Sequence, residues 1–303
     1  MKIALLGLSN CGKTSIYNVV FTEKTAIECE NLAPTVSYEI HSHPFLGIKL
    51  GLFDFGGQKD HRMEYLERPE LFVGTDVLIF IVDLHDRDNY NAAKEYFQVI
   101  LDVIKKNNEK PKVYLLLHKN DTKDYQTDLL ETNIEDAKSH FLELFNDFNF
   151  NFEFTSIYEH EKLATIFRNM LFSFFEELRV HVIRTDKQLK EINAIIIITD
   201  ISGNILSHNY HGINSGFVLR GELREFLEAS NKVRENIFLS ESLTFNAKKG
   251  EKELNLYIIK YILCVLVLKS KELDKHSQQK LSILLKDMNL FGNLILTMSN
   301  TSN

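Results

Sequence analysis

The sequence predicts an α/β fold with a mostly parallel sheet, followed by a smaller α+β domain. Over residues 1–180, short apolar runs alternate with amphipathic segments, which is the pattern of βαβ units. The apolar runs are continuous in Val, Ile and Leu, as in strands that are buried on both faces. A charged segment at residues 180–192 separates this region from a different order of elements. We therefore expect two domains, residues 1–182 and residues 183–303.

The strands of the first domain are predicted from their apolar runs. KIALLG should be a buried strand that runs into a glycine loop, and DVLIFIVDL and KVYLLLHK should be buried strands further along the chain. TVSYEIHS and HPFLGIKLGLFDF are joined by a tight Pro-containing turn. This pair predicts an antiparallel hairpin at the edge of the sheet.

The helices are predicted from apolar residues that recur three and four positions apart. NYNAAKEYFQVILDVIKKN and NIEDAKSHFLELFNDF have this spacing in the first domain, so each should pack one face on the sheet. In the second domain, LRGELREFLEAS and KHSQQKLSILLKDMN have it as well.

The second domain is expected to contain antiparallel strands. AIIIITDISGNILSHNY predicts a hairpin that turns at residues 202–204, and further strands are expected from Ser242 to Leu268. The apolar run from Leu254 to Leu268 is interrupted by Lys260 and is shorter than the roughly 20 residues of a membrane-spanning helix. We therefore interpret it as paired core strands.

Length and composition are those of an ordinary globular chain. With 303 residues, two compact domains can each bury a core. The 35 Lys and Arg residues against 42 Asp and Glu give a net charge of −7, which argues against a nucleic-acid partner and against direct binding to anionic lipid. Cys11, Cys29 and Cys264 lack paired or metal-ligand spacing. We expect a cytoplasmic protein without direct membrane insertion, recruited peripherally to a membrane only through a partner.

Residues 7–14, GLSNCGKT, match the phosphate-binding pattern G-x-x-x-x-G-K-[ST] between a predicted strand and a predicted helix. The glycines let backbone N–H groups wrap an anion, Lys13 adds a full positive charge near the β and γ phosphates, and the Thr14 hydroxyl can bind Mg²⁺. The alternative is a plain strand-to-helix turn with Lys13 in solvent. The order of strand, loop and helix favours the phosphate site.

The segment DFGGQ, from Asp54 to Gln58, ends the third predicted strand, at the sheet edge where the phosphate loop also lies. There Asp54 can hold magnesium through a water, the Gly57 N–H can contact a γ-phosphate, and Gln58 can orient an attacking water. Thr35, just before the second strand, can complete the metal shell with its hydroxyl.

HKND, beginning at His118, follows another buried strand and resembles the guanine-reading N-K-x-D motif, with His in place of Asn. An Asp at the position of Asp121 can accept hydrogen bonds from guanine N1–H and the 2-amino group, which adenine does not offer. The stem of Lys119 can cover the face of the base. Taken in isolation, the segment also fits a charged turn.

Together these residues resemble the small GTPase class, and the Rag/Gtr family of nutrient-signalling GTPases in particular. Four stretches carry the resemblance: GLSNCGKTSI, VSYEIHSHPFLGIKLGLFDFGGQKDHRMEY, LLLHKNDT and FEFTSIYEH. LLLHKNDT contains the His-Lys-x-Asp variant of that family, so His118 matches the family. The similarity covers residues 1–180 in its motifs, and the rest in its arrangement of elements.

The resemblance implies a Ras-like P-loop G domain followed by a roadblock (longin-like) domain through which two subunits dimerise. It implies that GTP or GDP is bound with Mg²⁺, and that Gln58, Lys13 and Gly57 act in hydrolysis. The implied metal ligands are Thr14, Thr35 and Asp54. The implied nucleotide contacts are Ser9, Asn10, Cys11, Gly12, Lys13, Thr14, Ser15, Thr35, Gly57, His118, Lys119, Asp121, Ser156 and Ile157.

Three functions remain open from the sequence. The first is a GTP-hydrolysing switch in a homo- or heterodimer, served by a roadblock-domain scaffold and by activating or exchange proteins. Its turnover should be slow, because Ser9 stands where most Ras-like proteins carry Gly. The second is a nucleotide-locked scaffold subunit of a heterodimer, against which Gln58 and Thr35 argue. The third is an ATP-using P-loop enzyme such as a kinase, against which the His-Lys-x-Asp segment argues.

Overall fold

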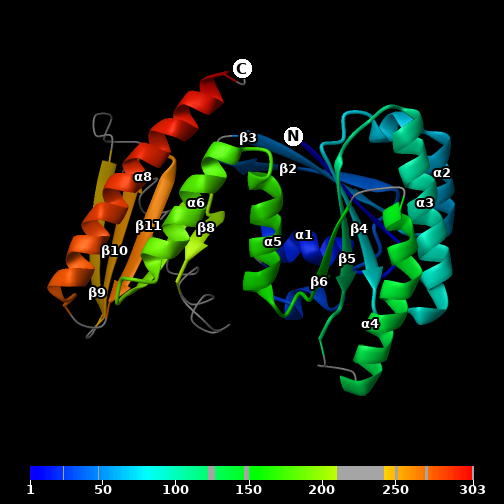
Figure 1. Ribbon diagram of the computed structural model, residues 1–303, viewed down its shortest axis with the longest axis horizontal. Coiled ribbons are helices and arrows are strands. Elements are labelled where there is room, and N and C mark those ends of the chain that lie inside the picture. Colours follow the sequence, from blue (N-terminus) through cyan, green and yellow to red (C-terminus); the bar gives the residue numbers. More distant parts are fainter. Residues whose placement is uncertain are drawn as a thin grey trace. The chain divides into compact units, whose positions relative to one another are not determined.

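The structure is a computed structural model that describes residues 1–22, 24–46, 48–121, 127–146, 150–209, 242–249, 252–269 and 272–301 (Figure 1). By internal packing the chain divides into two units. The first contains Met1–His43 and Lys49–Leu163, and the second contains Pro44–Ile48 and Ala164–Asn303. The predicted boundary between residues 182 and 183 lies inside a helix, α6.

The first unit is built on a six-stranded sheet with the order β2-β3-β1-β4-β5-β6. β1 pairs in parallel with β3 and β4, and β4-β5 and β5-β6 are also parallel, so the prediction of a mostly parallel sheet is confirmed. The predicted edge hairpin corresponds to β2 at the sheet edge, next to β3. The strands are β1 (Lys2–Gly7), β2 (Tyr38–Phe45), β3 (Ile48–Phe55), β4 (Val77–Asp83), β5 (Lys112–His118) and β6 (Phe150–Thr155).

Helices cover both faces of this sheet, with α2, α3 and α4 on one side and α1 on the other (Figure 1). In α3, Ala93, Phe97, Ile100 and Ile104 recur three and four positions apart and are buried, which confirms the helix predicted there. Short 3₁₀ turns lie between several elements. The helices are α1 (Lys13–Phe21), α2 (Lys59–Glu67), α3 (Tyr90–Lys106) and α4 (Thr127–Leu142). The next helix, α5 (His160–Phe172), begins in the first unit and continues into the second, because the division falls between Leu163 and Ala164.

The parallel register brings the carboxyl ends of the strands to one edge of the sheet. Asp83 at the end of β4 pairs with His118 at the end of β5, and His118 pairs with Thr155 at the end of β6. β1 ends nearby, because its last residue Gly7 pairs with Ile81 of β4. Loops that follow these strands therefore share one edge, where ligands of α/β sheets bind.

The second unit is a five-stranded sheet with the order β8-β7-β11-β10-β9, and every neighbouring pair is antiparallel. The predicted hairpin is confirmed as β7-β8: Gly203, at φ 91°, donates its N–H to Asp200 O across the turn. The run from Leu254 to Leu268 forms the paired strands β10 and β11, as predicted. The strands are β7 (Ile195–Asp200), β8 (Ile205–His208), β9 (Ser242–Lys249), β10 (Lys252–Ile259) and β11 (Leu263–Lys269).

Helices α6 (Glu176–Leu189) and α8 (Lys275–Thr301) lie side by side on this sheet (Figure 1). The charged segment at residues 180–192, which we expected to separate the domains, is largely helical. Although the segment is rich in charged residues, α6 has one buried face. It is formed by residues spaced three and four positions apart: Leu178, Val182, Thr185 and Leu189. The helix predicted for LRGELREFLEAS lies outside the described residues.

Helix α8 is longer than the predicted KHSQQKLSILLKDMN helix. Over Lys275–Met298 it is long and apolar enough to cross a membrane by length and composition, and 33% of its most apolar window is buried. Leu284, Met288 and Phe291 are buried, so one face of α8 packs against the rest of the second unit. Core helices satisfy the same length and hydropathy criteria, so the absence of direct membrane insertion remains a prediction.

The turn between β2 and β3 belongs to the second unit. There the Asp200 carboxylate is 1% exposed and accepts hydrogen bonds from the N–H groups of Leu46, Ser202 and Asn204, each at 2.9 Å. Burial raises the pKa of Asp200, and these hydrogen bonds oppose that shift. Phe45 packs edge-on against Phe172, with ring centroids 5.7 Å apart.

Candidate functional site

The loop between β1 and α1 has the backbone shape that its glycines permit. Gly7 has φ 147° and Gly12 has φ 96°, values that residues with a side chain rarely adopt. A Cβ atom on Gly7 would also collide with the carbonyl of Ile81 and the Sγ of Cys11. Gly12 is the N-cap of α1, so the loop delivers the chain directly to the positive end of a helix.

Lys13 is 5% exposed, which excludes the alternative of a lysine pointing into solvent. Its Nζ donates to Leu8 O at 2.8 Å and to Gly7 O at 3.3 Å, and it lies 3.6 Å from Cys11 Sγ. The ammonium group is therefore folded back over the loop and concentrates positive charge inside it. This is the position from which a lysine contacts a bound phosphate.

The three predicted metal ligands converge, although they come from three separate elements. Thr14 Oγ1 donates to Asp54 Oδ2 at 2.6 Å and lies 3.0 Å from Thr35 Oγ1, which is 3.5 Å from Asp54 Oδ2. Asp54 is fully buried, and its Oδ1 has no hydrogen-bond partner among the described residues. Burial raises the pKa of Asp54, and the Thr14 hydroxyl and the charge of Lys13 oppose that shift.

These oxygens fit a magnesium ion. Mg²⁺ prefers one or two carboxylates, hydroxyls, waters and substrate phosphates as ligands, and a buried carboxylate oxygen without a partner is a group that a cation or its water would satisfy. Thr14, Thr35 and Asp54 would hold the ion directly or through water. Lys13, which directly precedes Thr14, would supply positive charge to the same phosphates.

Gly57 and Gln58 begin the segment that leads into α2. Gly57 is buried, and its backbone lies so close to the Leu8–Ser9 peptide that any side chain there would collide with it. Gly57 therefore borders the phosphate loop. Gln58 is the exposed N-cap of α2, and Ser9 and Asn10 are exposed on the facing loop.

The predicted base-reading residues follow β5 and β6 at the same edge of the sheet. Asp121 accepts a hydrogen bond from Ser156 Oγ at 2.6 Å, and Ser156 is fully buried. Lys119 Nζ forms an ion pair with Asp83 Oδ2 at 2.6 Å. Ile157, next to Ser156, is partly buried.

His118 lies deeper in the protein than the other residues of its motif. It is 2% exposed, and its Nδ1 is 2.9 Å from Thr155 Oγ1. Burial, reinforced by the charge of Lys119, lowers the pKa of His118 to about 3, so the ring is neutral at physiological pH. The ring contacts the phosphate loop, since a Cβ atom on Gly12 would lie 2.5 Å from His118 Cδ2.

The sequence analysis missed three residues of this region: Asp83, Thr155 and Tyr65. Asp83 had a usable signal, because it is an acid at the carboxyl end of a buried strand that neighbours the His118 strand. Thr155 lies in the Thr-Ser-Ile segment, of which only Ser156 and Ile157 were predicted to contact the nucleotide. Tyr65 gave no signal, since a tyrosine on a predicted helix is common.

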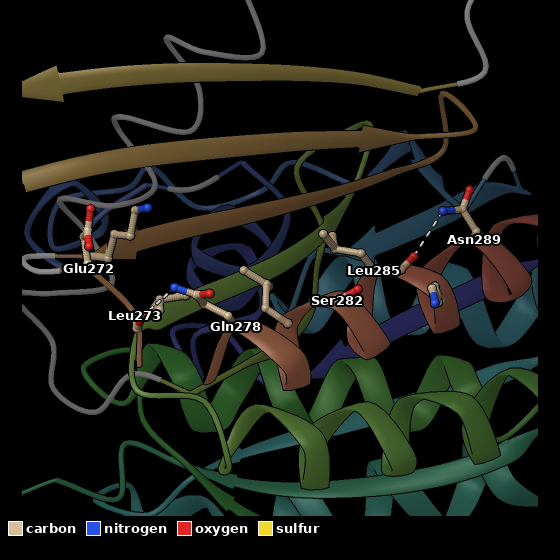
Figure 2. A pocket seen from close by; sticks show the side chains of 9 residues that line it. Glu272, Leu273, Gln278, Ser282, Leu285 and Asn289 are labelled. Carbon is tan, nitrogen blue, oxygen red and sulfur yellow. Dashed lines mark hydrogen bonds between the residues drawn. The ribbon is translucent and has the colours of Figure 1, made fainter. Parts of the chain in front are cut away.

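A cavity of about 530 Å³ lies in the second unit beside α8 (Figure 2). In this cavity Gln278 Nε2 donates to Leu273 O at 2.7 Å and Asn289 Nδ2 donates to Leu285 O at 3.1 Å, so these polar groups are occupied by backbone. None of the predicted site residues lines it. Its lining residues are Lys269, Glu272, Leu273, Gln278, Leu281, Ser282, Leu285, Lys286 and Asn289.

Comparison with known proteins identifies the family. Residues 2–202 match the Gtr1/RagA G protein conserved region. The chain is 29% identical to Ras-related GTP-binding protein A of Dictyostelium discoideum over 216 residues, 69% of each chain. It is 33% identical to GTP-binding protein gtr1 of Schizosaccharomyces pombe over 52% of this chain and 51% of that protein.

A third relative extends the similarity to nearly the whole chain. GTP-binding protein GTR1 of Saccharomyces cerevisiae is 27% identical over 299 residues, 90% of this chain and 93% of its own length. Residues 2–202 contain the predicted phosphate loop, the three predicted metal ligands and the His-Lys-x-Asp segment. The chain belongs to the Gtr1/RagA family of small GTPases.

Proposed function

We propose that this GTPase is a molecular switch that binds GTP and GDP with Mg²⁺, hydrolyses GTP slowly, and dimerises through its C-terminal domain. The observation that carries the proposal is the convergence of Thr14, Thr35 and Asp54 beside the buried ammonium of Lys13. Such a set of oxygens and one cation suits a magnesium-bound polyphosphate.

Each residue at the phosphate end has a role that follows from its position. The N–H groups of the loop and the start of α1 bind phosphate oxygens, and Lys13 neutralises their charge. Gly57 borders the loop, so its N–H is proposed to contact a γ-phosphate. Gln58 is exposed beside that point, so it can orient a water for attack. Magnesium, when bound, neutralises charge that develops on the phosphate oxygens.

Guanine selectivity rests on Asp121. The carboxylate accepts two hydrogen bonds from guanine, and the Ser156 hydroxyl holds it in place at 2.6 Å. The base contacts of Ile157 and Lys119 are also part of the proposal. Lys119 is tied to Asp83, which fixes its stem beside the motif.

The switch would operate through the segments that contain Thr35 and Gly57. A γ-phosphate orders them and its loss releases them, which changes the surface offered to a partner. The hairpin, strands and final helix of the second unit agree with the roadblock arrangement that the family resemblance implies. We propose that this unit pairs with a second subunit, equal or different, in the cytoplasm, and that a partner supplies any contact with a membrane.

Two measurements test the proposal. Purified protein should bind GTP and GDP much more tightly than ATP in the presence of Mg²⁺; equal affinity for ATP would contradict a guanine-reading switch. Single-turnover hydrolysis should be on the order of 10⁻⁴ s⁻¹ without an activating protein. Gln58→Leu should slow it further, whereas a locked scaffold would show the same negligible rate with and without the substitution.

A further inference from the structure

Ser37 follows the metal-site residue Thr35 by two positions, and its carbonyl oxygen accepts two hydrogen bonds. The N–H of Gly56 donates to it at 2.7 Å, and the Tyr65 hydroxyl donates to it at 2.5 Å. Both donors come from the segment that ends β3 and forms α2. The segment that contains Thr35 and the segment that follows Asp54 are therefore joined at one atom.

The segment that contains Ser37 needs this support. Ser37 has φ 54°, a left-handed conformation that a serine adopts at a cost. Gly56 approaches so closely that a Cβ atom on it would lie 2.6 Å from both the Thr35 and the Ser37 carbonyl oxygens. A strained segment of this kind keeps its conformation only when neighbouring groups hold it.

Tyr65 is itself rigidly held. It is fully buried, and its ring packs edge-on against Phe55 with centroids 5.0 Å apart. Burial raises the pKa of Tyr65 to about 12, so the phenol keeps its proton and remains a donor at neutral pH. The hydroxyl is thus a fixed donor aimed at a strained backbone segment.

We propose that Tyr65 is a positioning residue for the GTPase reaction: its hydroxyl holds the Ser37 carbonyl so that Thr35 stays at the metal site. Thr35 lies 3.0 Å from Thr14 Oγ1 and 3.5 Å from Asp54 Oδ2 in this arrangement. The inference rests on the proposed function, in which a γ-phosphate orders the segment that contains Thr35. Tyr65 therefore favours the GTP-bound state over the GDP-bound state.

The test is Tyr65→Phe, which removes one oxygen atom and leaves the ring in place. We expect dissociation of a fluorescent non-hydrolysable GTP analogue in Mg²⁺ to accelerate about 3- to 10-fold, the worth of one hydrogen bond. Dissociation of fluorescent GDP should change less than about 2-fold. Single-turnover GTP hydrolysis should slow by a factor similar to that for the analogue.

Tyr90→Phe is the matched control. Tyr90 is 1% exposed and its hydroxyl also donates to a backbone carbonyl, Leu84 O at 2.7 Å, far along the chain from Thr35. The substitution should cost similar stability but leave the ratio of the two dissociation rates unchanged. A Tyr65→Phe variant that behaves in the same way would overturn the proposal, because its hydroxyl would then serve the fold alone.

A second variant isolates the route through Thr35. In a Thr35→Ala background, Tyr65→Phe should change dissociation of the analogue by less than about 2-fold, since the group it positions is gone. A full effect in that background would also overturn the proposal. If the wild-type protein failed to retain the analogue in Mg²⁺, the proposed function would fail with it, whereas an unchanged ratio in Tyr65→Phe would refute only the role of Tyr65.

Discussion

The edge of the His118 imidazole lies against the Cα atom of Gly12, so that a Cβ atom on Gly12 would be 2.5 Å from Cδ2 and 2.8 Å from Nε2 of the ring. Because Nδ1 of the same ring is 2.9 Å from Thr155 Oγ1, the imidazole connects the phosphate loop to the ends of β5 and β6. The phosphate-binding and base-reading segments are packed against one another through this ring.

Gly12→Ala should damage this contact. The substitution combines a collision with His118 and a φ of 96°, so we expect a loss of about 3 kcal/mol in the free energy of unfolding, measured by denaturant titration. Gly74→Ala is the control, because Gly74 has φ 67° and nothing within 4 Å of an added Cβ. It should cost about 1–2 kcal/mol. If both substitutions lowered the free energy of unfolding equally, the His118 ring would be able to move aside for a methyl group at residue 12 without cost.

His118 should make stability depend on pH. Its pKa falls from 6.5 in the unfolded chain to about 3 in the folded protein, so below pH 6.5 the unfolded state binds more protons. The stability that a neutral His118 contributes is full above pH 6.5 and is lost progressively as pH falls toward 3. At pH 5 the loss should be about 2 kcal/mol relative to His118→Asn. Parallel stability curves for the two proteins would contradict the burial of a neutral ring.

Asp121 and Ser156 should have separable effects on nucleotide binding. Asp121→Asn should reduce the preference for GDP over ADP by about 100-fold, because the base loses a charge-assisted pair of hydrogen bonds. Ser156→Ala removes only the 2.6 Å hydrogen bond that orients the carboxylate. It should weaken GDP binding by about 5-fold while the preference for guanine remains. Competition binding with both nucleotides measures the two effects, and a preference unaffected by Asp121→Asn would refute the base assignment.

Removal of magnesium should release nucleotide. Chelation with EDTA should accelerate GDP dissociation by about 10-fold or more in the wild-type protein, because the phosphates lose their bridging cation. In Asp54→Asn the rate should already be high and should respond little to EDTA. Asp83→Asn, which alters an acid at the end of β4, with β1 between β4 and the strand of Asp54, should keep the full response. A wild-type rate that is indifferent to EDTA would argue against the metal site.

The sequence predicted those features that local patterns specify. The continuous apolar runs identified the strands, and the ordered strand, loop and helix around Lys13 identified the phosphate loop. The parallel register then accounts for the convergence of Asp54, Asp121 and the loop at one edge. The charged residues of α6 predicted a separating segment between the domains, but the helical spacing of the buried residues Leu178 and Val182 shows that it packs as a helix.

Features that join distant parts of the chain left no pattern in the sequence. The ion pair between Lys119 and Asp83 and the bond from Tyr65 to Ser37 connect residues 36 and 28 positions apart. A left-handed conformation is usually predicted from a glycine, but the residue in this conformation here is Ser37. Such contacts depend on which loops lie together at the sheet edge, and this cannot be predicted from the spacing of residues along the chain.

Because the turn at Pro44–Ile48 belongs to the second unit, no single truncation of the chain separates the two units cleanly. A fragment that stopped at residue 163 or 182 would still carry this turn, with Phe45 and Leu46 that are only 4% and 1% exposed in the whole chain. Either fragment would leave the Leu46 amide without the Asp200 carboxylate, and the shorter one would also leave Phe45 without its ring partner Phe172. Isolated fragments of this half should therefore be prone to self-association, and biochemical comparisons are best made on the intact polypeptide.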